Sequence, residues 1–274
     1  MSRSRDIADS TKTLDVDGGT IKLDGNYPVG TENVALGDTA LDSVQSGGNY
    51  NVAIGDKSLT DNTTGDQNTA VGRVSLTNNT TGGNNVAIGG DALFTNTTGG
   101  NNVAVGKDSL ALNTTASNNT AVGYQAGRSN TTGASNASLG KGSLYSNTTG
   151  NFNVAFGDTA LQANTTASGN TAVGFQAGYS HTTNGYLTAI GYKAGYTGNT
   201  DNAFVGYEVG YNSTGGSNTA MGSYRALYSN TSGSKNTAIG REALQANTTA
   251  SENIAVGYQA GFSTTTGGAN TAVG

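Results

Sequence analysis

The chain of 274 residues has no cysteine, no tryptophan, one proline and one histidine. Without cysteine it has no disulfide bonds, no thiolate metal sites and no cysteine nucleophile. Charged residues make up only 11% of the chain and the net charge is -5, so no basic footprint for nucleic acid is present. No apolar run approaches the length of a membrane span, and membrane insertion is not expected.

Large apolar residues are also scarce. Leu, Ile, Val and Phe together make up about a sixth of the chain, which is below the usual level for a packed globular domain. Disordered chains share that shortage but usually carry a high net charge, and this chain does not. Glycine (43 residues), asparagine and threonine dominate instead, and these residues are typical of tight turns between short strands.

What the chain does contain is a repeat. A pentapeptide of the form Asn-Val-Ala-Ile-Gly or Asn-Thr-Ala-Val-Gly occurs fifteen times, and ten of the fourteen intervals between its glycines are 17 residues. The other intervals are 18, 15, 16 and 18 residues. A fixed period in this range indicates a repeat architecture in which no unit buries its own apolar face alone. The glycines are Gly37, Gly55, Gly72, Gly89, Gly106, Gly123, Gly140, Gly157, Gly174, Gly191, Gly206, Gly222, Gly240, Gly257 and Gly274.

The five pentapeptide positions alternate in character. Position one is Asn in all copies except Leu187, position three is a small Ala except at Ser138 and Phe204, and position five is always Gly. Positions two and four are β-branched or apolar in most copies, which predicts a short strand with two different faces. The predicted fold is all-β, a parallel β-solenoid or β-roll of about fifteen 17-residue coils, with the asparagines of position one stacked in an amide ladder.

A narrow coil cannot enclose positions two and four together with the Leu that recurs four residues after most glycines. We therefore expect an apolar stripe to stay exposed along the rod and to drive self-association. Where that Leu becomes Gly, as at Gly127 and Gly178, the residue after the pentapeptide becomes aromatic, as at Tyr124 and Phe175. This correlation suggests that the ring fills the volume that the missing Leu leaves.

The repeats resemble two known groups of proteins. Asn51-Val-Ala-Ile-Gly55 and Asn85-Val-Ala-Ile-Gly89 resemble the head repeats of trimeric autotransporter adhesins, and the similarity covers residues 33–274. That resemblance implies a left-handed β-roll, a homotrimer and attachment to host surfaces. The Asn-Thr-Thr-Gly turns, with the opening Ile21-Lys-Leu-Asp-Gly-Asn-Tyr-Pro-Val-Gly30, are more similar to tail-fibre and appendage proteins of bacteriophages.

Two segments are predicted. Residues 1–32 precede the repeat and alternate on both sides of Gly18-Gly19, which predicts a hairpin that caps the first coil or docks the rod onto virion structural proteins. Residues 33–274 form the β-roll shaft. The first residues do not read as a secretory signal, which favours a virion protein assembled in the cytoplasm over a secreted adhesin.

The expected function is therefore structural: the shaft of a phage tail fibre or appendage that supports attachment to a host. The alternative is a bacterial surface adhesin or a self-assembling filament, located at the cell surface or outside the cell. We find no catalytic, cofactor-binding or metal-binding motif and expect no enzyme. The single histidine, His181, replaces the Asn of an Asn-Thr-Thr turn and is expected at the surface.

Two features of the repeats suggest contact with sugars. The coil length is irregular between residues 174 and 228, where aromatic residues are also concentrated. Exposed rings beside Asn and Thr suit stacking on sugars, so this zone is predicted to touch surface glycan. Separately, the Asn-Thr-Thr turns satisfy the N-glycosylation sequon and would carry sugar along one edge if the chain were secreted. The predicted glycan-contact residues are Tyr179, Tyr186, Tyr196, Tyr211 and Tyr228.

Overall fold

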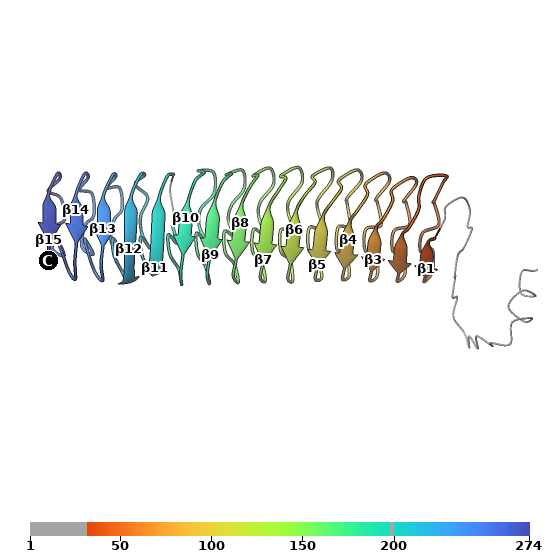
Figure 1. Cartoon of the computed structure of the whole chain (residues 1–274), viewed down its shortest axis with the longest axis horizontal. Coiled ribbons are helices and arrows are strands. Elements are labelled where there is room, and N and C mark those ends of the chain that lie inside the picture. Colours follow the sequence, from red (N-terminus) through yellow and green to blue (C-terminus); the bar gives the residue numbers. More distant parts are fainter. Residues whose placement is uncertain (1–31, 198–199) are drawn as a thin grey trace, which may run out of the picture.

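The chain forms a straight stack of coils in its computed structural model, which describes residues 32–197 and 200–274 (Figure 1). Each coil contributes one short strand, and the fifteen strands build a single parallel sheet in which every strand pairs with the next one along the chain. The predicted all-β parallel solenoid of about 17 residues per coil is confirmed, with about 14 turns. The strands are β1 (Val34–Leu36), β2 (Val52–Ile54), β3 (Thr69–Val71), β4 (Val86–Ile88), β5 (Val103–Val105), β6 (Thr120–Val122), β7 (Ala137–Leu139), β8 (Val154–Phe156), β9 (Thr171–Val173), β10 (Thr188–Ile190), β11 (Ala203–Tyr207), β12 (Thr219–Tyr224), β13 (Thr237–Ile239), β14 (Ile254–Val256) and β15 (Thr271–Val273).

The sheet register follows the pentapeptide. Val105 pairs with Val122, and the same position meets its equivalent in every neighbouring coil. The alanine of position three points into the coil and is fully buried at Ala104, whereas positions two and four point outward. A Cβ added to Gly106, whose φ is +128°, would lie 2.5 Å from the carbonyl oxygen of Gly123. Only glycine fits at position five because the next coil's backbone occupies that space.

The interior of the coil is narrow, and three kinds of side chain fill it beside the buried asparagines described below. Ala104 of position three, Ser109 three residues after the glycine and Leu110 four residues after it all lie inside. The recurring Leu is therefore enclosed, and the exposed apolar stripe that the sequence predicts is formed by positions two and four alone.

Two buried asparagine ladders run along the rod. In the first, formed by position one, the backbone amide of Asn119 donates to Oδ1 of Asn102 over 2.9 Å. In the second, formed by the Asn-Thr-Thr turns, Nδ2 of Asn113 donates to Oδ1 of Asn96 over 2.8 Å. The predicted amide ladder is confirmed at position one, and the turns add a second ladder that the sequence analysis did not foresee. Buried amides that are paired from coil to coil hold each coil in register with the next.

The second ladder overturns two expectations about the Asn-Thr-Thr turns. Their asparagines, among them Asn79 and Asn96, are buried, so the amides of these turns are not accessible for N-glycosylation in the folded rod. His181 is only 1% exposed and stands inside the rod at the ladder position, so the surface location predicted for it is wrong. The sequon threonines lie at the rim of the coil, and the asparagine turns inward because its amide has a partner there. The predicted hairpin in residues 1–32 lies almost entirely outside the described residues.

Candidate functional surfaces

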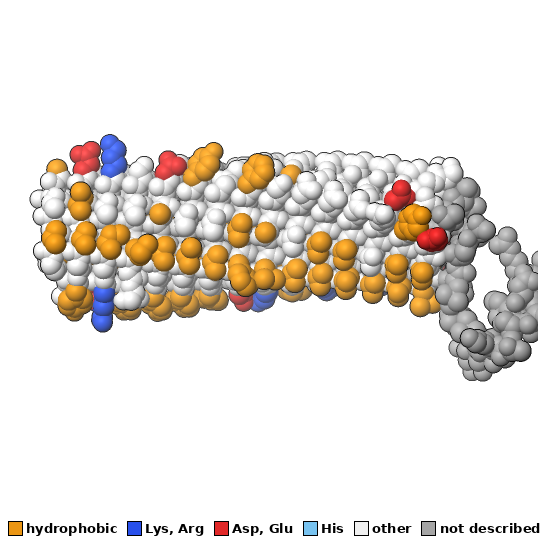
Figure 2. Space-filling view, viewed as in Figure 1, with side chains coloured by type: hydrophobic (Ala, Val, Ile, Leu, Met, Phe, Trp, Pro, Cys, Tyr) orange, Lys and Arg blue, Asp and Glu red, His pale blue; other side chains and the backbone are white. Residues whose placement is uncertain are grey.

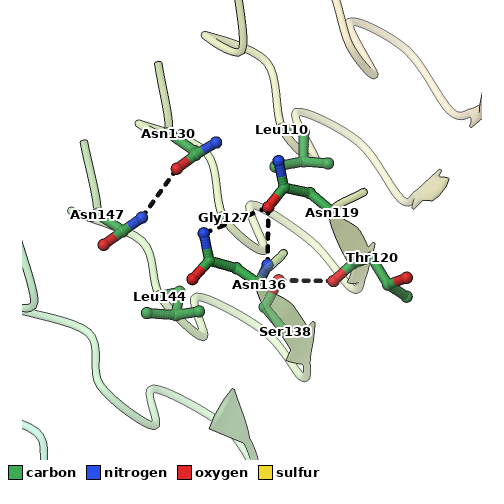
Figure 3. Close-up of a pocket in the computed structure, with 9 residues that line it drawn as sticks. All are labelled: Leu110, Asn119, Thr120, Gly127, Asn130, Asn136, Ser138, Leu144 and Asn147. Atoms are coloured by element: carbon green, nitrogen blue, oxygen red, sulfur yellow. Dashed lines mark hydrogen bonds between the residues drawn. The ribbon is translucent and has the colours of Figure 1, made fainter. Parts of the chain in front are cut away.

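A small cavity interrupts the interior beside Gly127 (Figure 3). One cluster of buried apolar residues ends at Ala126 and the next begins at Leu144, with Gly127 between them. The cavity measures about 10 Å³, which is room for roughly one water molecule. Its walls carry no acidic or basic side chain and only the hydroxyls of Ser138 and Thr120, and we interpret it as a packing gap left by the missing Leu. Its walls are Leu110, Asn119, Thr120, Gly127, Asn130, Asn136, Ser138, Leu144 and Asn147.

Three of the other four missing leucines, at Gly178, Gly195 and Gly210, are replaced by side chains from inside the coil. Leu187, which breaks the asparagine pattern at position one, lies against the space that Gly178 leaves, and Phe204, which breaks the alanine pattern, lies against Gly195 and Gly210. Both side chains are fully buried. The suggestion that the aromatic residue after the pentapeptide fills this volume is wrong, because Phe175 and its equivalents lie outside the coil and are about half exposed.

The outer face of the sheet carries an apolar row along the whole rod. Position four is Leu, Ile, Val, Phe or Met in all fifteen strands, and its side chains are exposed or half-buried throughout. Ile88 is 40% exposed and Phe156 is 52% exposed, although both are large apolar residues. Figure 2 shows hydrophobic side chains in rows parallel to the long axis, with few charged groups between them. Exposed apolar rows of this length are typical of surfaces that associate with another molecule.

A second surface is formed by two stacks of aromatic rings, which we call the aromatic band. Ring centroids within each stack are 4.8 to 5.4 Å apart and neighbouring rings are within 19° of parallel. The stacks begin in the 17-residue coil after Gly174 and continue through the three coils of 15, 16 and 18 residues that follow it. The Phe175 ladder contains Phe175, Tyr192, Tyr207 and Tyr224, and the Tyr179 ladder contains Tyr179, Tyr196, Tyr211 and Tyr228.

Four of the five predicted glycan-contact residues make up the Tyr179 ladder. Tyr186, the fifth, lies apart from them, just before β10, where its ring is 71% exposed and rests beside Gly169. The Phe175 ladder is a unit that was not predicted from the sequence. Its signal was present, because aromatic residues recur at intervals of about one coil from Phe175 to Tyr224.

Charged side chains lie between the two ladders. The ammonium of Lys193 lies 5.4 Å from the centroid of the Tyr192 ring and 5.9 Å from that of Tyr196, so it touches both ladders. The guanidinium of Arg225 lies in the same way between Tyr224 and Tyr228. Cations held against ring faces in this manner are attracted by the ring quadrupole.

The two cations differ in their partners. Nε of Arg225 donates to Glu208 over 2.7 Å, and this hydrogen bond raises the pKa of Arg225 above its ordinary value. Lys193 makes no ion pair with any carboxylate in residues 32–197 and 200–274. The carboxylate of Glu208 therefore neutralises the charge of Arg225, whereas the charge of Lys193 has no carboxylate partner among the described residues.

Other kinds of site are not found in the part of the chain that the structure describes. It contains no group of three or more His, Cys, Asp or Glu side chains placed to hold a metal ion. None of its segments is a helix with the length and apolar character needed to cross a membrane.

Comparison with protein-family models, with curated proteins and with solved structures gave no match to this chain.

Proposed function

We propose that the chain is the shaft of a phage tail fibre or appendage, assembled as a homotrimer through the outer face of its sheet and supporting attachment to a host surface. The observation that carries this proposal is the unbroken apolar row of position four. An exposed row that includes Ile88 and Phe156 favours burial against another copy, because burying it removes apolar area from water along the whole rod.

The rod is also built to resist bending. Backbone hydrogen bonds join successive coils outside the strands as well as within them, for example from the amide of Leu93 to the carbonyl of Ser109 over 3.0 Å. The two asparagine ladders add side-chain bonds in the same direction. Such a rod is stiff without a large apolar core, which suits a shaft that holds other parts of a particle at a distance.

The number of copies rests on the resemblance to trimeric head repeats, and the apolar row supports self-association in general. Docking of the shaft to the virion through residues 1–32 belongs to the same proposal. A bacterial surface adhesin or a self-assembling extracellular filament would use the same apolar row and remains the second candidate, with a location outside the cell instead of on a virion.

The solution mass tests the assembly. The chain has a mass of 27.4 kDa, so a trimer has 3 × 27.4 = 82.2 kDa. Light scattering after size exclusion is expected to give the trimer mass. A monomer would overturn the proposal, and an open-ended series of larger masses would favour the filament.

A variant separates the interface from the fold. Replacing Ile88 and Val105 with Asp places two charges in the outer row, where they are incompatible with burial. We expect this variant to be a monomer with an unchanged β-sheet circular dichroism spectrum. The control, Thr98→Asp, adds a charge at an exposed turn and should keep the trimer mass. A trimer that survives both outer-row charges would exclude this face as the interface.

A further inference from the structure

We infer that the aromatic band is a binding surface for a linear acidic polysaccharide that lies along the rod axis. This inference deepens the proposed attachment function. It rests on that function in one respect only, namely that the polysaccharide belongs to a host surface.

The accessible parts of the band are ring edges and hydroxyls. Within the Tyr179 ladder each inner ring has a neighbour on both faces, as Tyr196 has in Tyr179 and Tyr211 at 5.0 and 4.8 Å. A ligand therefore cannot stack on the faces of these inner rings, which changes the kind of sugar contact that the sequence suggests. It meets a row of phenol edges and hydroxyls, which offer apolar contact and hydrogen bonds side by side.

The distance between successive rings of a ladder favours one class of ligand. Equivalent hydroxyl-bearing rings recur once per coil at 4.8 to 5.4 Å. One pyranose unit of an extended polysaccharide is about as long as one coil is thick, so each sugar of a chain along the axis would meet the same set of atoms. An extended peptide advances about 3.3 Å per residue and falls out of step with the rows.

The positive charge of the band indicates that the bound polysaccharide is acidic. Lys193 lies between the ladders with its ammonium near both Tyr192 and Tyr196 and without a carboxylate partner among the described residues. A uronate or a sulfate group on the bound sugar would supply that partner by a charge-assisted hydrogen bond. Arg225 is already paired with Glu208, so we assign the anion contact to Lys193.

The test uses the full chain and two defined probes, an octamer of mannuronic acid and the neutral cello-octaose, in isothermal titration at low salt. The wild type is expected to bind the acidic octamer and to bind the neutral one at least about tenfold more weakly, which corresponds to one charge-assisted contact. Lys193→Gln should remove this preference. The matched control Lys141→Gln changes an exposed lysine outside the band and should leave binding unchanged.

A second pair of variants tests the rings. Tyr196→Phe with Tyr211→Phe keeps the stack but removes two hydroxyls, and we expect weaker binding of both octamers. Replacing the same residues with Ala should weaken binding further. No binding of either probe, equal binding of both, or binding unchanged in the Lys193 and Phe variants would overturn the inference. The solution mass of every protein is measured by light scattering, so that loss of the trimer and loss of sugar binding are distinguished.

Discussion

The ring of Phe204 occupies the place that a side chain at residue 210 would take. A Cβ added to Gly210 would lie 2.6 Å from Cδ1 and Cε1 of that ring, whereas one added to Gly127 would lie 3.0 Å from the flexible Cδ2 of Leu110. Both glycines stand where most coils carry Leu, and both have a φ near +60°. The space at Gly210 is thus filled by a ring from the strand of the same coil, and the space at Gly127 is left as a cavity.

This contrast predicts different results for the same substitution. Gly127→Leu should be tolerated, because leucines such as Leu76 and Leu93 adopt a similar backbone conformation and only the flexible end of Leu110 has to move. Gly210→Leu should destabilise by about 3 kcal/mol or prevent folding, because the Phe204 ring cannot leave a packed interior. Thermal unfolding followed by circular dichroism compares the two variants. Equal melting temperatures would contradict our account of the core.

The turn asparagine ladder should dominate the stability of its coils. Asn113→Ala removes the bonds of Nδ2 to Asn96 and to the carbonyl of Ala116, and it takes away one of the two acceptors of Asn130 Nδ2. We expect the free energy of unfolding to fall by about 2 to 3 kcal/mol. Thr115→Ala, two residues away at an exposed position, should change it by less than about 0.5 kcal/mol. Urea unfolding measures both, and a similar loss in both variants would argue against the ladder.

The ladder can also be extended. Asn247 Oδ1 is buried without a donor, and the residue at the equivalent place in the next coil is Thr264 instead of Asn. Thr264→Asn should supply that donor and raise the stability of the last coil by about 1 kcal/mol. Hydrogen exchange of the amides in residues 247–265 measures the local effect. The control is Thr265→Asn, which places the same amide at an exposed position and should leave this exchange unchanged.

A related position lies at His181. Asn164 Oδ1 is likewise buried without a donor, and His181 stands at the next place in the ladder. His181→Asn would place an amide there that can donate to Asn164. We expect a rise in the urea midpoint. A fall would mean that the imidazole makes contacts worth more than one amide bond.

The Tyr179 ladder should make the rod sensitive to alkali. Burial, and next the negative charge that Tyr211 and Tyr179 carry once ionised, raise the pKa of Tyr196 above its ordinary value of 10.0. Because the folded pKa lies above the unfolded one, this stability is fully present below pH 10 and is lost as the pH rises through the folded pKa. Unfolding midpoints at pH 8 and pH 11 should therefore differ less in Tyr196→Phe than in the wild type. An equal difference in both would show that this phenol is not responsible.

Much of this architecture is determined by the sequence alone. A small residue, a glycine and two β-branched residues at a fixed period can form only a short strand with one narrow inward face, and fifteen copies in register predict the parallel solenoid. The outward apolar row follows from the same pattern, because side chains alternate along a strand and the inward Ala of position three places Val105 and Ile88 on the outer face.

The tertiary structure decided what depends on contacts between coils. The inward turn of the sequon asparagines is possible only because the next coil supplies a partner for each amide, and the same stacking buries His181. The departures at Leu187 and Phe204 look like repeat decay along the chain, yet each fills a space that a glycine in a neighbouring coil creates. The aromatic band arises in the same way, since residues one coil apart become nearest neighbours only when the coils stack.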